Sequence, residues 1–309
     1  MTQALTMIWN PSEGIDLGFF MIRYYSLMWV VAFALGFYVM KKIFIREGES
    51  LDKLDSLFFY TIIATMFGAR LGHVIFYQSE LFREDFLSVF LPIRTNPEFE
   101  FTGFSGLASH GAAIGIIIAM FYYSRNIIKK PILWVLDRVV LSVSLGAIFI
   151  RIGNFINSEI LGRATTSPLG IKFIQDEYSH YQITQETGIA NYKQAYSAAI
   201  NNPEFAPLID SISPKHPVQL YEALGYVMVF AILFYLYWKT NARLKQGYLF
   251  GVFMILLWSI RFFAEFIKES QGGFEGADPL LSTGQWLSIP FIILGFYLIK
   301  RSKEVKSAS

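Results

Sequence analysis

Seven long apolar stretches, separated by short polar segments, dominate the chain. They cover approximately residues 19–40, 57–77, 107–124, 132–152, 217–238, 247–267 and 285–300. Several reach the ~20 residues that an α-helix needs to cross a hydrocarbon layer ~30 Å thick. The pattern predicts an all-α polytopic membrane protein with seven transmembrane helices.

Composition agrees with a membrane protein. Of the 309 residues, 54% are hydrophobic and only 16% are charged, whereas a soluble domain carries about 25% charged residues. The chain has no cysteine, which excludes disulfides and any thiol of its own as nucleophile or metal ligand. The segment before the first apolar stretch contains Glu13 and Asp16 but no basic residue. We therefore expect a retained helix rather than a signal peptide.

The basic residues sort by side of the membrane. They follow the first, third, fifth and seventh stretches, as Lys41, Lys42, Arg46, Lys53, Arg125, Lys129, Lys130, Lys239, Arg243, Lys245, Lys300, Arg301, Lys303 and Lys306. The amino terminus has none before Arg23, and the segment 78–106 is mainly acidic. By the positive-inside rule, the N-terminus is outside and the C-terminus is cytoplasmic.

One predicted external segment is too long for a simple connector. Residues 155–216, between the fourth and fifth helices, are largely polar and contain several proline and glycine residues. This length predicts an external arm or small subdomain, inserted into a single transmembrane domain that spans residues 1–309. Neither an internal repeat nor the inverted halves of many transporters is visible.

Charges at membrane depth cost at least ~2.5–3.5 kcal/mol each, so they are candidates for function. The stretch FIRIGNFINSEILGR (149–163) contains Arg151 and Asn154, which share one helix face if Gly153 does not end the helix. Glu159 and Arg163 follow. The alternative is that Arg151 lies at the interface and extends its side chain to the lipid headgroups, as a lone arginine at a helix end commonly does. The neighbouring Asn and Glu favour a functional role.

A second group lies in WSIRFFAEFIKES, where Arg261, Glu265 and Lys268 share one stripe of the sixth predicted helix. The alternative is an Arg–Glu pair that satisfies itself and only holds helices together. For Glu265 this alternative and a direct role are equally supported.

His110 opens the third predicted helix in LASHGAAIG. A single histidine near an interface is commonly a packed residue. However, its small neighbours permit the close approach of a backbone or substrate, and imidazole is suited to proton transfer near neutral pH.

The fourth group is HPVQLYEALGY, where Pro217 suits a helix start and Gln219 and Glu222 fall on one face. The alternative, a capped helix start, is favoured for His216 and stays open for Glu222. Two groups are weaker. Arg23 precedes Tyr24 and Tyr25 at the outer end of the first predicted helix, where an aromatic belt is the ordinary explanation. GARLGHVIFYQ places Arg70 and His73 inside the second predicted helix, and Arg70 is deep enough to require a partner.

Two buried arginines from different helices thus converge on the external half of the membrane. Arginine recognises phosphate through two parallel hydrogen bonds, and a phospholipid headgroup is the commonest phosphate at that depth. The residues support a lipid-phosphate site without naming a reaction. A transporter or lipid flippase could use the same charges as a relay, and a scramblase-like or purely structural membrane protein is a third alternative.

The same residues resemble a known family. The blocks GARLGHVIFYQ, LASHGAAIG, RIGNFINSEILGR, HPVQLYE, IRFFAEF and GQWLSIP occur in this order and are similar to those of the bacterial prolipoprotein diacylglyceryl transferases. The resemblance runs from about Arg23 to Pro290. It implies transfer of the diacylglyceryl group of phosphatidylglycerol to the lipobox cysteine of a prolipoprotein, releasing glycerol phosphate. It also implies the bacterial cytoplasmic (inner) membrane, no cofactor and no nucleic-acid partner.

The resemblance carries over residue by residue. His110 matches the family's essential histidine, Arg261 its second essential arginine, and Tyr25 the tyrosine of its first helix. Its signature polar residues correspond to Arg151, Asn154 and Glu159. The residues expected to bind phosphatidylglycerol are Arg151, Arg261, Asn154, Tyr25, Glu265, Arg70, Gln219 and Glu222. There are departures: Ser109 replaces a common Phe, Lys268 an Arg, and Leu257 a Tyr, and the region 164–215 matches poorly.

A mechanism follows as a hypothesis. Because the chain has no cysteine, the nucleophile is the substrate thiol, which must lose its proton to attack. His110 is the candidate base. Arg151 and Arg261 would hold the lipid phosphate and stabilise the charge that grows on the leaving group. No spacing of His and carboxylate residues predicts a metal site.

Overall fold

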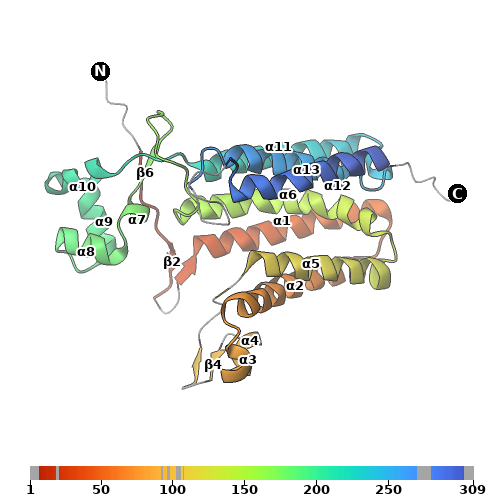
Figure 1. Ribbon diagram of the computed structural model, residues 1–309, viewed down its shortest axis with the longest axis horizontal. Helices are drawn as coiled ribbons and strands as arrows, with labels where there is room; N and C mark the ends of the chain where they lie inside the picture. The colour runs from red at the N-terminus through yellow and green to blue at the C-terminus, as the bar shows by residue number, and fades with distance from the viewer. Residues whose placement is uncertain are drawn as a thin grey trace. The chain divides into compact units, whose positions relative to one another are not determined.

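The computed structural model describes residues 7–18, 21–91, 93–95, 98–101, 106, 108–269 and 280–302. It divides into two compact units, residues 1–36 with 140–309, and residues 37–139. A helix occupies each of the seven predicted stretches (Figure 1): α1 Tyr24–Glu47, α2 Leu51–Tyr77, α5 Ser109–Tyr122, α6 Ile132–Ile156, α11 Val218–Lys239, α12 Tyr248–Ala264 and α13 Thr283–Arg301. A π-helical segment, η1 Tyr123–Ile128, continues α5.

Several of these helices are long and apolar enough to cross a membrane. Among the described residues there are five, at Tyr24–Glu47, Leu51–Tyr77, His110–Ile128, Ile132–Ile156 and Val218–Lys239. The apolar helix α12 is shorter, at 17 residues. A bilayer allows helices because each satisfies its backbone hydrogen bonds internally. The prediction of a helical, multi-pass membrane protein is confirmed.

Two helix boundaries differ from the hydropathy pattern for local reasons. Helix α1 begins at Tyr24 instead of residue 19, because Met21–Arg23 (β3) pairs antiparallel with Gly14–Asp16 (β2). Helix α6 does not end at Gly153 but continues to Ile156. Arg151 and Asn154 therefore lie one turn apart on a continuous helix.

In the unit of residues 37–139, α2 and α5 lie side by side at very close range (Figure 1). A Cβ at Gly72 would lie 2.6 Å from the Cα of Gly111, and one at Gly115 would lie 2.5 Å from the carbonyl oxygen of Ala64. Gly68–Gly72 and Gly111–Gly115 are both GxxxG pairs, which let helix backbones touch. This interface fixes the start of α5, where His110 lies.

The same unit contains buried charges that the sequence analysis did not single out. Arg138, 2% exposed, pairs with Glu47 at 3.0 Å and lies over the ring of Trp134. In the turn after α1, Glu49 contacts Lys53 at 2.7 Å and Lys130 at 3.4 Å. Burial alone would raise the pKa of Glu49, but hydrogen bonds and charge from these two lysines lower it below its ordinary value. These contacts join the end of α1 to the beginnings of α2 and α6.

In the other unit, small residues again lie where helices meet. The hydroxyl of Ser142 on α6 donates to the carbonyl of Gly36 on α1 at 2.9 Å. Helices α11, α12 and α13 pack in sequence order (Figure 1). A Cβ at Gly251 on α12 would lie 2.9 Å from the carbonyl oxygen of Gly295 on α13. Arg151, Glu222 and Arg261 all belong to this unit.

Residues 164–215 form a folded arm rather than an extended loop. Ile171–Phe173 (β6) pairs in parallel with Met7–Trp9 (β1). The helices that follow are α7 Ile174–Glu177, α8 His180–Thr187, α9 Tyr192–Asn201, η2 Pro203–Phe205 and α10 Ala206–Ser211. Their apolar core is Ile174, Ile183, Ala195, Tyr196, Ala199, Ile209 and Ile212. Burial raises the pKa of Tyr196 to about 12, and its hydroxyl donates to the carbonyl of Tyr178.

The α2–α5 contact generates a prediction for stability. Gly72→Leu inserts a side chain against the backbone of Gly111, so the helices must separate, at a cost of roughly 1–3 kcal/mol or more. The apparent melting temperature in detergent should fall by several degrees. Ile118→Leu, at a position 64% exposed on α5, is the control and should melt with the wild type. A Gly72→Leu protein that melts at the wild-type temperature would contradict the close packing.

Candidate active site

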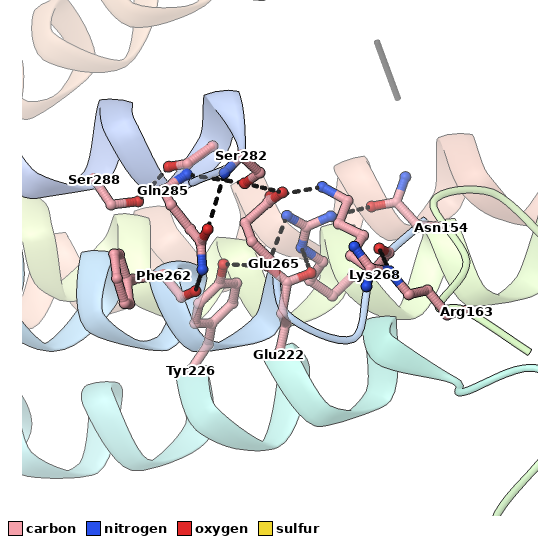
Figure 2. Close-up of polar contacts among 12 residues, drawn as sticks. Asn154, Arg163, Glu222, Tyr226, Phe262, Glu265, Lys268, Ser282, Gln285 and Ser288 are labelled. Atoms are coloured by element: carbon pink, nitrogen blue, oxygen red, sulfur yellow. Dashed lines mark hydrogen bonds and ion pairs between the residues drawn. The ribbon is translucent and has the colours of Figure 1, made fainter. Parts of the chain in front are cut away.

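A buried ion pair joins α6 to α11. Arg151, 7% exposed, meets Glu222, 2% exposed, through two contacts of 3.1 Å, Nε to Oε2 and Nη2 to Oε1. The hydroxyl of Tyr226, one turn after Glu222, also donates to Oε1 at 3.2 Å (Figure 2). The contact from Nη2 is a charge-assisted hydrogen bond, which is stronger than a neutral one, and the contact from Nε is an ion pair. Glu222 therefore compensates the charge of Arg151 inside the apolar region.

A chain of polar contacts leads from Arg151 to Glu159. Asn154 accepts from Arg151 Nη1 at 3.4 Å and donates through Nδ2 to Glu159 Oε2 at 3.3 Å. Asn157 donates to the other oxygen of Glu159 at 2.9 Å. The side chain of Gln219, fully buried on α11, donates to the main-chain carbonyl of Glu159. The exposed Glu159 is thus held through both its side chain and its backbone.

The turn that carries Glu159 has an uncommon backbone. Its two neighbours, Ser158 and Ile160, both lie in the left-handed region, with φ of 54° and 58°. A β-branched residue such as isoleucine rarely adopts this conformation, which costs on the order of 1–3 kcal/mol. The hydrogen bonds to Glu159 hold the turn in this shape. No glycine marks these positions, so the sequence carried no signal for them.

The end of the RIGNFINSEILGR stretch joins two other segments. Gly162 N donates to the carbonyl of His216 at 3.0 Å, and Arg163 N donates to the carbonyl of Ile267 at 2.8 Å. A Cβ at Gly162 would lie 2.6 Å from the Cβ of His216 and 2.8 Å from the carbonyl oxygen of Ile267. Only glycine leaves room for both neighbours.

The arm is attached at the same place. Lys215 contacts Asp176 of the arm at 2.7 Å and Glu269, after α12, at 2.9 Å. Partial burial alone would lower the pKa of Lys215, but the hydrogen bonds and charges of these two carboxylates raise it above its ordinary value. The ammonium group therefore stays charged and ties the arm to the segment that follows α12.

The second charged group surrounds the end of α12. Glu265 Oε1 meets the ammonium group of Lys268 at 3.2 Å, and Glu265 Oε2 accepts from the hydroxyl of Ser282 at 3.2 Å (Figure 2). Lys268 is 7% exposed, and its carbonyl accepts from Arg163 Nε at 3.2 Å. The described side chains do not form the Arg261–Glu265 pair considered above, because the carboxylate of Glu265 contacts Lys268 and Ser282 instead.

Arg261 is placed differently from Arg151. Its guanidinium lies 5.5 Å from the ring centre of Trp258, within cation–π distance. Its Nε is buried and has no hydrogen-bond partner among the described residues. A buried donor without an acceptor is unfavourable. This arginine is therefore able to take an anionic ligand without first breaking an internal bond from that nitrogen.

Tyr25 and His216 complete the larger unit. A Cβ at Gly153 would lie 2.9 Å from the Tyr25 ring, so the missing side chain lets Tyr25 pack on the helix of Arg151. Helix α11 begins after Pro217, without a side-chain cap. The capped helix start considered for His216 and Glu222 is therefore wrong: His216 lies 3.4 Å from the Tyr221 hydroxyl, and Glu222 pairs with Arg151.

The remaining predicted residues lie in the unit of residues 37–139. His110 is an exposed residue in the first turn of α5, with its ring 5.4 Å from that of Phe76 and 6.4 Å from that of Tyr77. Arg70 donates to the carbonyl of Ser88 at 2.6 Å, which supplies a partner for its charge. The side chain of Ser109 lies outside the described residues.

A short turn supports Arg70. Asp85 precedes the five-residue helix α4 Phe86–Phe90 and accepts from the backbone of Ser88 and from both the backbone and hydroxyl of Thr95. These hydrogen bonds lower the pKa of Asp85 well below its ordinary value. The Ser88 carbonyl is thereby held where Arg70 meets it.

The structure adds residues that sequence reasoning missed. Tyr226 was within a quoted motif, and its spacing of four from Glu222 was an available signal. Ser282 and Gln285 gave no such signal, because their contacts to Glu265 and Phe262 cross 17 and 23 positions of the chain. Within the part of the chain that the structure describes, no three His, Asp or Glu residues form a group suited to a metal ion.

Comparisons with known proteins assign the family. The model of the family described as "Prolipoprotein diacylglyceryl transferase" matches residues 13–301. Three similar proteins carry the name phosphatidylglycerol–prolipoprotein diacylglyceryl transferase. The one from Bacteroides fragilis is 33% identical over 308 residues, covering 98% of each chain. The one from Tolumonas auensis is 33% identical over 302 residues, covering 97% of this chain and 99% of that one.

The third, from Porphyromonas gingivalis, is 38% identical over 289 residues, covering 91% of this chain and 89% of its own. These matches extend over both compact units and every helix that carries a predicted site residue. The chain therefore belongs to the prolipoprotein diacylglyceryl transferase family and is a membrane-bound transferase.

Proposed function

We propose that this chain transfers the diacylglyceryl group of phosphatidylglycerol to the lipobox cysteine of a prolipoprotein. The sulfur of the deprotonated thiol attacks the glycerol carbon that bears the phosphate. A C–S bond forms, the C–O bond to phosphate breaks, and glycerol phosphate leaves. The family assignment and the names of the full-length relatives support this reaction.

The observation that carries the proposal is the unsatisfied donor of Arg261. Arg151 is paired with Glu222, and Lys268 with Glu265, whereas Arg261 Nε is buried without an acceptor among the described residues. Cleavage turns a phosphodiester with one negative charge into a monoester with up to two. A cation at that point stabilises the transition state more than the bound lipid, which is the requirement for catalysis.

In this proposal Arg151 orients the lipid phosphate through its remaining N–H groups. Three of its contacts go to Glu222 and Asn154. A guanidinium has five N–H groups, so about two are left for phosphate oxygens. Its charge is already balanced by Glu222. Arg151 would orient the phosphate, while Arg261 would supply the uncompensated positive charge.

The other residues take supporting roles. His110 is the general base that accepts the thiol proton, directly or through another group. Asn154, Glu159 and Glu265 orient the lipid and the arginines. Tyr25 and Arg70 contact the lipid, and Gln219 and Glu222 act on it through the groups they hold, the Glu159 carbonyl and Arg151. No metal or cofactor takes part in these steps.

The proposed topology places seven helices across the bacterial inner membrane, as a single domain with the N-terminus outside and the C-terminus in the cytoplasm. Helices α12 and α13 are the sixth and seventh crossings; their mutual packing supports a helical hairpin. The arm of residues 164–215 would then lie outside, where a prolipoprotein arrives, and would set the preference for that substrate.

The phosphate role of Arg261 predicts a loss of activity without a loss of stability. In membranes supplied with phosphatidylglycerol and a lipobox peptide, Arg261→Ala should reduce formation of the heavier peptide by about 10²–10³-fold, as for removal of one charge-stabilising donor. Mass spectrometry measures the product. Arg94→Ala, at a side chain 55% exposed, is the control. Near-normal turnover by Arg261→Ala would refute the role. If the wild-type protein moved labelled lipid across vesicle membranes but did not modify the peptide, a flippase would be favoured instead.

Arg151→Ala should behave differently, because it also leaves the carboxylate of Glu222 buried and unpaired. Breaking a buried pair in this way costs about 3–5 kcal/mol. We expect transfer to be abolished and the apparent melting temperature to fall well below that of Arg261→Ala. The comparison is made on both purified proteins in one detergent. Equal melting temperatures for the two variants would contradict the asymmetry between the arginines.

His110→Gln separates proton transfer from lipid binding. Glutamine retains hydrogen-bonding groups but cannot act as a base near neutral pH, so transfer should be lost while phosphatidylglycerol still binds. Binding is measured by retention of labelled lipid on the purified variant. Wild-type turnover by His110→Gln would eliminate the base assignment, and loss of lipid binding would make His110 a binding residue instead.

A further inference from the structure

The carboxylate of Glu265 lies against the first turn of α13. Ser282, the N-cap of this helix, donates its hydroxyl to Glu265 Oε2 at 3.2 Å. The same serine forms a capping box with Gln285, and Gln285 Nε2 donates to the carbonyl of Phe262 at 3.4 Å. The first turn of α13 is thus anchored on α12, with Glu265 between them (Figure 2).

Gly284 is the residue of that turn that faces Glu265. A Cβ at position 284 would lie 2.5 Å from Glu265 Oε1 and 2.9 Å from its Cγ. Such distances are too short for real contacts. The three nearest obstacles all belong to the Glu265 side chain and none to the backbone. A methyl group here would therefore displace the carboxylate while the helices could stay where they are.

The position of this carboxylate affects more than one contact. Its Oε1 holds the ammonium group of Lys268. The backbone of Lys268 pairs with Gly162, and its carbonyl accepts from Arg163. Residues 162 and 163 end the stretch that also carries Arg151 and Glu159. Displacing the Glu265 carboxylate would thus also shift the ammonium group of Lys268, at the point where α12 is joined to that stretch.

We propose that Gly284 is a positioning residue, whose missing side chain seats the Glu265 carboxylate between Ser282 and Lys268. This inference rests on the proposed transfer reaction, in which Glu265 orients the lipid and the arginines, and it assigns the part of α13 that serves that reaction. Gly284 acts through Glu265 and does not touch the substrate. A carboxylate beside the N-terminus of a helix is also favoured by the helix dipole.

Alanine at position 284 separates this role from a general effect on the fold. Position 284 is the second residue of α13, where alanine is at least as favourable as glycine because it leaves the unfolded chain less conformational freedom to lose. The fold should lose nothing, or gain slightly. A loss of activity without a loss of stability would therefore come from displacement of the carboxylate.

The test is a double-mutant cycle with Glu265→Asp. Aspartate is one methylene shorter and leaves room for a methyl group at position 284. We expect Gly284→Ala to reduce peptide modification about tenfold or more when residue 265 is Glu, but by less than about threefold when it is Asp, as for two residues in direct contact. The apparent melting temperature of Gly284→Ala should equal or exceed that of the wild type.

Gly295→Ala is the matched control on the same helix. A Cβ at Gly295 would meet the backbone carbonyl of Gly251 at 2.8 Å, so this variant should melt at a lower temperature, and Glu265→Asp should not relieve its defect. The positioning role is refuted if Gly284→Ala has near-wild-type activity, or if it loses the same factor with Glu and with Asp at position 265. Failure of the wild type to modify the peptide would instead refute the proposed reaction.

Discussion

The contact between Arg151 and Glu222 is the interaction on which the larger unit depends. Neither charge is acceptable alone in an apolar region, because removing an ion from water costs several kcal/mol. Arg151 contacts both oxygens of Glu222 at 3.1 Å, the Tyr226 hydroxyl donates to Oε1, and together these contacts balance the charge of Glu222 and hold α11 against α6. Arg151 in turn holds Asn154, which holds Glu159. One buried pair thereby helps to fix an exposed carboxylate in the turn after α6.

Glycine has a distinct task at each place where this unit is crowded. At position 153 it admits the ring of Tyr25, at 162 it admits two neighbouring backbone segments, and at 284 it admits the Glu265 carboxylate. In the other unit, Gly72 and Gly111 bring two helix backbones together. Because lipid gives little hydrophobic force between helices, close packing of this kind supplies the stability. Absent side chains thus position both the helices and the polar groups.

The sequence predicts the helices well because long apolar stretches have few alternatives in a membrane. It also predicts the Arg151–Asn154 contact, since residues three apart meet on a helix. It could not predict the start of α1, which the pairing of β2 with β3 determines. One of the two alternatives for Glu265 was a pair with Arg261, four residues earlier. The structure uses Lys268 and a serine 17 positions away, and such contacts depend on how α12 and α13 pack.

Other features were missed for different reasons. The left-handed residues Ser158 and Ile160 leave no mark in the sequence, because neither is a residue type that favours this conformation. The buried Asp137 and Arg138 are charges inside the fourth apolar stretch, but Glu47, the partner of Arg138, lies 91 positions away in the chain. Local spacing therefore reveals contacts within a helix, whereas contacts between helices follow only from the assembled packing.

The unequal environments of Arg151 and Arg261 suit the proposed reaction. If both guanidinium groups were fully paired with carboxylates, an arriving phosphate would have to displace those bonds and would gain little. If neither were paired, two buried charges would destabilise the protein before any lipid arrived. Pairing Arg151 with Glu222 and leaving Arg261 Nε without an acceptor among the described residues avoids both extremes. Arg151 stabilises the folded state through its pair with Glu222, whereas Arg261 can form its strongest interaction with the bound phosphate.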